Sequence, residues 1–262
     1  MDLDLTGKHA LVCGASEGIG RAAAMELAAL GADVTVLARR EQVLAEVAAT
    51  LPRSHDAQRH GWLAADMDDS DTLRRKATAL AAGARVHILV NNSAGPPPGP
   101  AAAAAPDDYL RTFQRHLIGG QVLVQALLDG MREAAYGRIV NVISTSVREP
   151  IANLGVSNTV RGAVASWAKT LASELGPHGI TVNSVLPGFT ETGRLASLIT
   201  GNARRSGRSE DEVAAGMLAN VPAGRFRKPE ETSAAIAFLC SPAAAYINGV
   251  TLAVDGGRTR AL

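Results

Sequence analysis

Seven short apolar runs alternate with helix-like segments along almost the whole chain, and this alternation restricts the fold more than any other feature. Each run has five to seven residues and ends near a glycine or a polar residue. Strands that alternate with helices form βαβ units, which build a parallel sheet with right-handed crossovers. The pattern therefore predicts an α/β, doubly wound fold with a seven-stranded, mostly parallel sheet and helices on both faces. The predicted strands are residues 9–13, 33–38, 61–65, 86–90, 138–143, 180–186 and 249–254.

No stretch of the chain has the length or composition of a linker, so residues 1–262 are predicted to form one domain. Helices are expected at about 19–30, 41–50 and 70–82. Aromatic residues are only 3% of the chain, so the core must consist of Ala, Val, Leu and Ile. The charged segment at about 190–221 lies between a strand and the last helix, and it is either a substrate lid or a surface excursion without a role.

Charge and composition exclude several classes of function. The net charge is +1, from 26 basic and 25 acidic residues, which favours neither nucleic acid nor an anionic membrane as a partner. No apolar run has the length of a membrane span, and the N-terminus lacks the pattern of a signal peptide, so a cytoplasmic protein is expected. Cys13 and Cys240 match no metal or redox spacing, so both are expected to be buried thiols and no metal site is predicted.

A glycine-rich segment follows the first predicted strand directly and begins a helix. Glycines at this place allow a sharp turn and a close approach of the backbone to a pyrophosphate, which the N–H groups of the helix N-terminus can bind. A glycine-rich turn without a ligand is the alternative. The candidate phosphate-binding residues are Gly14, Ser16, Glu17, Gly18, Ile19 and Gly20.

Four motifs in order identify the chain as resembling the short-chain dehydrogenase/reductases, and among them the β-ketoacyl-acyl-carrier-protein reductase branch. The glycine segment resembles the family's TGxxxGIG motif, and the resemblance extends over essentially the whole chain. It implies a Rossmann-type fold. It also implies cofactor contacts from Asp66 and Met67 at the adenine, from Asn92, Ser93 and Ala94 in the cleft, and from Pro187, Gly188 and Thr190 at the nicotinamide. The other motifs are residues 91–94 (NNSA), residues 187–192 (PGFTET) and residues 255–257 (DGG).

The end of the second strand indicates which cofactor is preferred. Proteins that prefer NAD place an acidic residue there to hold the ribose diol. Here Ala38 is followed by Arg39 and Arg40, and a guanidinium can bind a 2′-phosphate. NADP(H) is therefore predicted over NAD(H). Two observations oppose this: surface arginines can simply solvate a helix start, and Glu17 occupies a place that is often basic in NADP-preferring relatives.

The catalytic pattern of the family is only partly present. Ser144, at the end of the fifth strand, matches the family's catalytic serine, and a purely structural hydroxyl is the weaker alternative. On the next helix Ser157 stands at the place of the catalytic tyrosine, and Arg161 at the place of the lysine. His116 falls near the family's asparagine, where an ordinary hydrogen bond is the alternative to a catalytic role.

These replacements change the expected chemistry. Arg161 can still bind ribose hydroxyls and remain charged, but it cannot supply a proton readily. Ser157 is shorter and far less acidic than a tyrosine. The proton is therefore expected to come through water held by Ser144 and Ser157, or from His116. Tyr109, two regular turns before His116, is a weaker candidate, and Tyr136 is expected at the wrong end of the sheet.

The resemblance implies an NADP(H)-dependent oxidoreductase that acts on a carbonyl or alcohol, similar to 3-oxoacyl-acyl-carrier-protein reductase, with an altered Ser-Ser-Arg site. Its substrate is expected to be a small molecule or an acyl group on a carrier, and the chain is expected to form a homotetramer or dimer. Two alternatives stay open. One is a cofactor-binding regulator or scaffold without redox turnover, and the other is a lyase or isomerase on the same fold.

Overall fold

The centre of the molecule is a seven-stranded sheet in which every pair of neighbouring strands is parallel. A computed structural model describes residues 1–261. The strand order is β3-β2-β1-β4-β5-β6-β7, so the chain changes direction along the sheet between β1 and β4. Ligands of such folds bind at that switch point, outside the carboxyl ends of the strands. The strands are β1 (His9–Cys13), β2 (Asp33–Ala38), β3 (His60–Ala64), β4 (Ile88–Asn91), β5 (Gly137–Val142), β6 (Ile180–Pro187) and β7 (Thr251–Val254).

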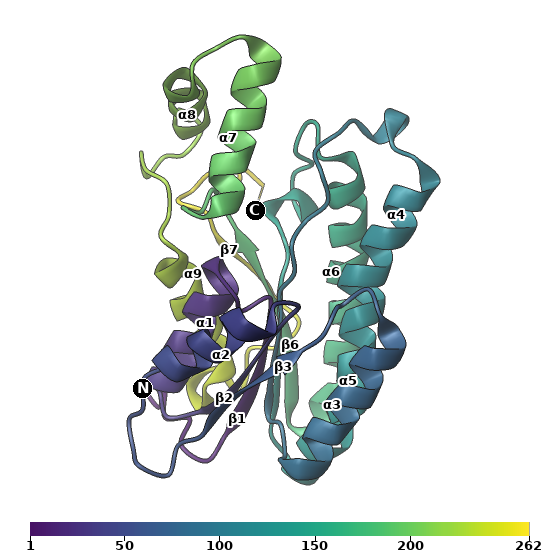
Figure 1. Cartoon of the computed structure of the whole chain (residues 1–262), viewed down its shortest axis with the longest axis vertical. Coiled ribbons are helices and arrows are strands. Elements are labelled where there is room, and N and C mark those ends of the chain that lie inside the picture. The colour runs from purple at the N-terminus through teal and green to yellow at the C-terminus, as the bar shows by residue number, and fades with distance from the viewer. Residues whose placement is uncertain (262) are drawn as a thin grey trace.

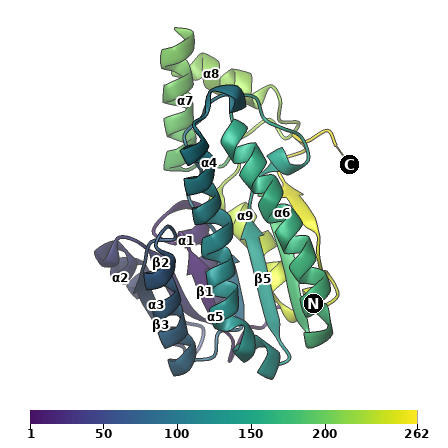
Figure 2. The same cartoon turned by 90° about the vertical axis from the view of Figure 1, so that its right-hand side faces the viewer.

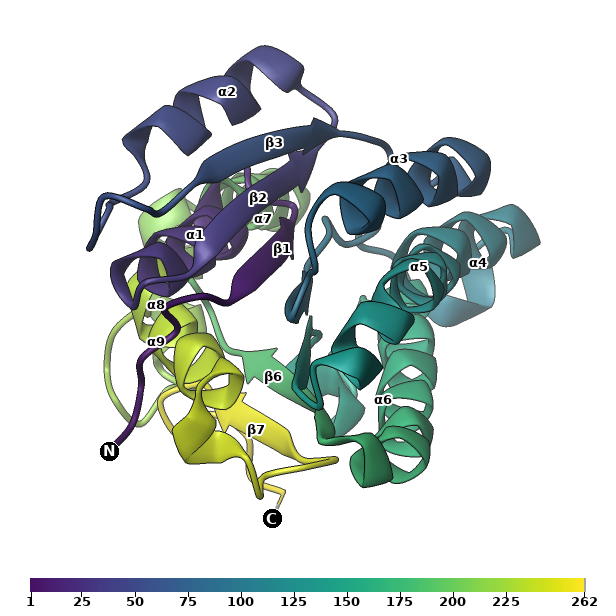
Figure 3. The ribbon, with the colours of Figure 1, turned by 90° about the horizontal axis from the view of Figure 1, so that it is seen from below.

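Helices cover both faces of the sheet, and the molecule therefore has three layers (Figures 1 and 3). The helices α1 (Gly18–Ala29), α2 (Glu41–Thr50) and α9 (Pro229–Cys240) lie on one face, and α1 packs against α9. The other face carries α3 (Ser70–Gly83), α4 (Pro106–Phe113), α5 (Gly119–Glu133) and α6 (Gly155–Leu175). This arrangement confirms the predicted Rossmann-like fold class.

The sheet separates two hydrophobic cores. In β1 the side chains of Ala10 and Val12 belong to the core that contains α1 and α9, whereas Leu11 and Cys13 belong to the core that contains α3 and α5. Successive residues of a strand point to opposite faces, so a strand that is buried on both faces must be apolar throughout. This requirement explains the continuous apolar runs of the sequence.

Most predicted boundaries agree with the structure within two residues. The predicted bounds of β1, β2 and α2 are confirmed. The seventh strand was expected from residue 249 but begins at Thr251, because Gly249 has φ +75° and turns the chain before the strand. The sheet was expected to be mostly parallel and is parallel throughout.

The segment at about 190–221 forms two helices, α7 (Gly193–Ser206) and α8 (Glu210–Leu218), which project beyond the carboxyl ends of the strands (Figures 1 and 2). The helix α4 continues into α5 through a π-helical turn, Gln114–Ile118, which contains His116. Among the helices of residues 1–261, none is both long and apolar enough to cross a membrane.

Candidate active site

The glycine-rich turn between β1 and α1 has the geometry of a phosphate-binding loop. Gly14 and Gly18 both have φ +59°, a conformation that side chains other than glycine adopt at a cost. A Cβ atom on Gly20 would lie 2.3 Å from the carbonyl oxygen of Gly14, so the first turn of α1 packs directly on the loop. Glycine is therefore required at all three positions for this close approach.

The end of β4 fixes the other side of this loop. The Asn92 side-chain amide donates hydrogen bonds to the carbonyl oxygens of Cys13 and Gly14, both at 3.3 Å. Asn92 thus ties the carboxyl ends of β1 and β4 together at the switch point. The sequence left open whether Asn92 is only a local turn residue, and the structure shows that it bridges two strands.

The N-terminus of α1 is suited to an anion. Its N-cap residue, Glu17, is extended and its side chain makes no capping hydrogen bond. The first N–H groups of a helix need partners, and a phosphate can supply them. The sharp turns at Gly14 and Gly18, the tight packing of Gly20 and the uncapped helix end together fit the pyrophosphate of a dinucleotide.

Thr192 borders the same loop, although it was absent from the predicted site residues. A Cβ atom on Gly18 would lie 3.2 Å from the Thr192 methyl carbon, and the Thr192 hydroxyl donates to the carbonyl oxygen of Thr190 at 3.3 Å. The spacing of two threonines after Pro187-Gly188 was the available signal. The segment after β6 therefore closes over the loop.

Two arginines follow β2 at the carboxyl edge of the sheet. Arg40 lies 3.5 Å from the Glu17 carboxylate, and both side chains are exposed. Arg39 is also exposed and has no carboxylate within ion-pair distance in residues 1–261. Glu17, which counted against NADP(H) in the sequence, is therefore placed beside Arg40, while Arg39 keeps an uncompensated charge at the end of β2.

The two residues predicted to contact adenine follow β3. Met67 is buried, and a Cβ atom on Gly119 would lie 2.8 Å from its carbonyl oxygen. The Asp66 carboxylate accepts a hydrogen bond from the backbone N–H of Asp68 at 3.1 Å. Asp66 thus shapes the turn after β3.

Arg161 binds the carboxyl ends of two neighbouring strands. Its guanidinium donates to the carbonyl oxygen of Val142, the last residue of β5, at 2.8 Å. It also donates to the carbonyl oxygen of Ser93, just beyond β4, at 3.3 Å. The side chain is buried, and burial, together with the charge of Arg194, lowers the pKa of Arg161 to about 10. The guanidinium therefore stays charged at neutral pH.

Arg194, at the start of α7, adds a second cation near Arg161. Its guanidinium donates to the carbonyl oxygen of Pro96 at 2.7 Å. One guanidinium nitrogen of each arginine lies within 4.0 Å of the point where a Cβ atom on Gly95 would stand. Neither guanidinium has a carboxylate within ion-pair distance in the described chain. The region between β4 and α7 is thus electropositive.

His116 lies beneath this region and is neutral. Its Nδ1 atom is 2.5 Å from the Ser93 hydroxyl, and its buried Nε2 atom has no hydrogen-bond partner within residues 1–261. Burial, followed by the charges of Arg161 and Arg115, lowers the pKa of His116 to about 2. The lowered pKa disfavours the imidazolium form as a proton donor, so of the two routes expected from the sequence it favours the one through water held by Ser144 and Ser157.

The two serines of the predicted site lie on consecutive elements. Ser144 follows β5, and its hydroxyl oxygen accepts a hydrogen bond from the backbone N–H of Ser146 at 3.1 Å. This contact supports a structural role, but it leaves the Ser144 O–H able to donate to a substrate. Ser157 is half-buried and lies one turn before Arg161 on α6, so the two side chains share a helix face.

The segment after β6 is held by a buried arginine. Arg227 donates to the Thr190 hydroxyl and to the carbonyl oxygen of Val254, and the Thr190 hydroxyl in turn donates to the carbonyl oxygen of Gly188 at 3.1 Å. A Cβ atom on Gly188 would lie 2.7 Å from the Cα atom of Asp255. Pro187 ends β6. The Thr190 side chain and carbonyl oxygen are thus engaged within the protein, which leaves the Thr190 backbone N–H for a ligand.

The two tyrosines weighed as proton donors both lie outside this group. The Tyr109 hydroxyl donates to the carbonyl oxygen of Ala101 at 3.3 Å, and the π-helical turn breaks the regular spacing that would have brought Tyr109 above His116. The Tyr136 hydroxyl donates to the carbonyl oxygen of Cys240 at 2.7 Å, and burial raises the pKa of Tyr136 to about 12. Residues 1–261 contain no cluster of His, Cys, Asp or Glu that could hold a metal ion.

The arrangement of these motifs matches a known family. Residues 14–259 match the family profile described as Enoyl-(Acyl carrier protein) reductase. The chain belongs to the short-chain dehydrogenase/reductases. The resemblance found in the motifs is thereby confirmed.

Similar proteins cover the full length of the chain. It is 35% identical over 253 residues to the short-chain reductase protein NovJ of Streptomyces niveus, across 95% of this chain and 93% of NovJ. It is also 35% identical to the 3-oxoacyl-[acyl-carrier-protein] reductase FabG of Vibrio harveyi, across 97% and 98% of the two chains. Among solved structures, L-sorbose reductase from Gluconobacter frateurii, complexed with NADPH and L-sorbose, superimposes with a TM-score of 0.93 at 28% identity over 100% of both chains. YwfH, an NADPH-dependent reductase involved in bacilysin biosynthesis, superimposes with a TM-score of 0.91 at 27% identity over 97% and 99%.

Proposed function

We propose that this protein is an NADP(H)-dependent oxidoreductase that reduces a carbonyl group, or oxidises the corresponding alcohol, through a Ser144-Ser157-Arg161 site. The observation that carries the proposal is the glycine loop at the switch point, with Arg39 uncompensated at the end of β2. The family and the relatives named as NADPH-dependent reductases agree with this cofactor, which the sequence had predicted.

The residues around the switch point would hold NADP(H) in a defined order. The turn at Gly14, Gly18 and Gly20 and the start of α1 would bind the pyrophosphate, and Arg39 would bind the 2′-phosphate. Arg161 would hold the nicotinamide ribose and keep a positive charge beside it. When bound, the nicotinamide supplies or accepts the hydride.

The protein groups then have to manage the oxygen of the substrate and its proton. The Ser144 hydroxyl oxygen uses a lone pair to accept from the Ser146 N–H. This contact does not occupy the O–H of Ser144, which can therefore donate to a carbonyl oxygen. Ser157 is too short to reach as a tyrosine would, so a water molecule between Ser144 and Ser157 would deliver the proton. His116 acts as a neutral positioning residue. It holds the Ser93 hydroxyl by a hydrogen bond, and the backbone carbonyl oxygen of the same Ser93 accepts from Arg161.

Cofactor titration with a matched variant tests the proposal. NADPH is expected to bind at least about tenfold tighter than NADH, and Arg39→Asp is expected to reverse the order, because a carboxylate repels the 2′-phosphate and binds the ribose diol. Arg40→Asp is the control, since Arg40 lies beside Glu17. Equal binding of both cofactors by the natural protein contradicts the assignment.

Turnover separates an enzyme from a binding protein. The change in NADPH absorbance is followed with a panel of ketones, oxo acids and 3-oxoacyl thioesters, with or without an acyl carrier. Oxidation of NADPH by any of them supports the proposal. Tight NADPH binding without turnover favours the second candidate, a cofactor-binding protein. The absence of a tyrosine at position 157 is the observation that supports this second candidate.

The proposal includes a cytoplasmic homotetramer or dimer. The sheet edge at β7 exposes Val250 and Leu252, and Tyr246 beside it is fully exposed. Exposed apolar side chains along an edge strand favour pairing with a second copy. The apolar residues of α9 are largely buried in the core against α1, so they contribute little to such an interface. Both cysteines are free and buried, in agreement with a reducing compartment.

A further inference from the structure

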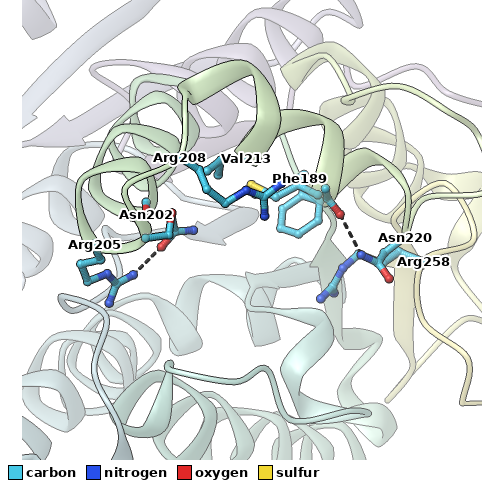
Figure 4. Close-up of a pocket in the computed structure, with 10 residues that line it drawn as sticks. Phe189, Asn202, Arg205, Arg208, Val213, Asn220 and Arg258 are labelled. Carbon is cyan, nitrogen blue, oxygen red and sulfur yellow. Dashed lines mark hydrogen bonds between the residues drawn. The ribbon is translucent and has the colours of Figure 1, made fainter.

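A pocket of about 490 Å³ lies between α7 and α8, above the segment that follows β6 (Figure 4). Its volume suits an organic ligand of moderate size. Phe189, Val213 and Met217 give it an apolar part, and the remaining lining is polar. Three arginines contribute to the lining, namely Arg205, Arg208 and Arg258.

The charges of these arginines are not compensated by ion pairs. Within residues 1–261, none of the three has a carboxylate oxygen within 4.0 Å. Arg208 donates only to the backbone carbonyl oxygen of Glu212, at 3.1 Å. Arg205 contacts the side-chain amide groups of Asn202 and Asn153. A pocket that gathers three cations without a direct ion pair is suited to an anion.

The acidic residues nearest to these arginines are already engaged by backbone N–H groups. The Glu212 carboxylate accepts from the N–H of Ser209 at 2.9 Å, at the start of α8. The Asp255 carboxylate accepts from the N–H groups of Gly257 at 3.0 Å and Thr259 at 2.8 Å. These carboxylates stabilise a helix start and a turn, and they act on Arg208 and Arg258 only from beyond ion-pair distance.

Arg258 connects the pocket with the proposed catalytic serine. Its guanidinium lies 4.7 Å from the centre of the Phe189 ring and donates to the Thr145 hydroxyl at 3.1 Å. Thr145 directly follows Ser144, and Phe189 directly follows Gly188 at the proposed nicotinamide end. In Figure 4 Arg208, which lies in the loop between α7 and α8, extends towards the Phe189 ring. Arg258 is thus the pocket arginine that reaches the end of β5.

We propose that this pocket binds an acidic group of the substrate, a carboxylate or a phosphate, through Arg208 and Arg258, with the apolar part of the substrate against Phe189 and Met217. The inference rests on the proposed function, because it describes the substrate of that site. A ligand anchored at Arg258 would lie next to Thr145, the residue that follows Ser144, and in this proposal that position brings its carbonyl group to Ser144 for reduction. The substrate class is therefore an acidic carbonyl compound rather than a neutral one.

Binding to the NADP⁺-saturated protein tests the pocket without requiring turnover. One titration compares octanoate with its neutral isostere octanamide, and a second compares 4′-phosphopantetheine with pantetheine, both by calorimetry. The acidic member of at least one pair is expected to bind about tenfold tighter, since hydrogen bonds to charged groups are the stronger ones. Preference in the first pair assigns a free carboxylic acid, and preference in the second assigns the arm of an acyl carrier.

The variants decide where that preference arises. Arg208→Gln with Arg258→Gln is expected to abolish it, and Arg208→Gln alone, at an exposed position, is expected to weaken it severalfold. Arg204→Gln is the matched control, because Arg204 is exposed on the neighbouring helix α7 and does not line the pocket. Equal binding within both pairs, or a preference that survives the double change, overturns the proposal. NADPH binding and turnover of neutral ketones in the same preparations show separately whether the proposed function stands.

Discussion

The burial of His116 in its neutral form predicts how the free energy of unfolding depends on pH. In the folded protein its pKa is lowered from 6.5 to about 2, chiefly by burial, whereas in the unfolded chain it returns to its ordinary value. The unfolded state therefore binds more protons, and stability must decrease as the pH falls below 6.5. The stabilisation is fully present above that pH and is progressively lost towards pH 2.

The size of the effect follows from the two pKa values. Between about pH 7 and pH 5, His116 alone should remove about 2 kcal/mol from the free energy of unfolding. The His116→Asn variant does not titrate, so its stability should decrease less over the same interval by about this amount. The substitution can also change the free energy of unfolding by altering the packing. That change is the same at every pH, so it cancels when the loss of stability between the two pH values is compared.

Urea unfolding at a series of pH values measures this difference. The lowered pKa of His87, to about 4, also contributes acid sensitivity, but equally in both proteins. His178→Asn is the control, because His178 is exposed, and its curve should follow that of the natural protein. If the natural protein and His116→Asn lose stability in parallel between pH 7 and pH 5, the neutral buried state assigned to His116 is refuted. A rate of reduction that rises with protonation of His116 near neutral pH would refute it independently.

Three further predictions concern the loop, the replaced pair and the assembly. Gly20→Ala should weaken NADPH binding by at least about tenfold in a fluorescence titration, because its Cβ would lie 2.3 Å from the Gly14 carbonyl oxygen and force the loop apart; unchanged affinity would contradict the loop's role. Ser157→Tyr with Arg161→Lys should raise ketone reduction at least about tenfold, and a slower double variant that still binds NADPH would show that the present pair already forms a working site. Light scattering should give a tetramer or dimer that Leu252→Glu weakens; a natural protein that is monomeric at micromolar concentration would rule out the assembly.

The sequence predicted the fold well because the fold depends on repeated local patterns. Each buried strand requires an apolar run, and each crossover requires a helix, so the order of elements could be obtained from periodicity alone. The glycines at 14, 18 and 20 were equally visible, since their spacing has a direct steric meaning. Asn92 could be placed in the cleft only by resemblance, because its bridge to Cys13 and Gly14 joins residues almost eighty positions apart.

The parts of the site that the sequence missed depend on contacts between distant segments. Nothing local to Arg194 or Arg258 indicates that one approaches Arg161 and the other reaches Thr145. The lowered pKa of His116 could not be foreseen for the same reason, since it depends on burial and on Arg161 and Arg115. The π-helical turn also has no periodic signature, yet it separates His116 from Tyr109.

The replaced residues change the electrostatics of the site as well as its proton donor. A tyrosine beside a lysine places an acidic phenol next to one cation, whereas Arg161 and Arg194 place two guanidinium groups near Gly95 without a titratable donor. Such a site stabilises negative charge that develops on the substrate oxygen, even when the proton arrives later from water. It also favours a substrate that is already an anion. If both proposals hold, the altered pair would act on the substrate oxygen and the arginine-lined pocket on an acidic group elsewhere in the same substrate, so a neutral ketone would use only the first of them.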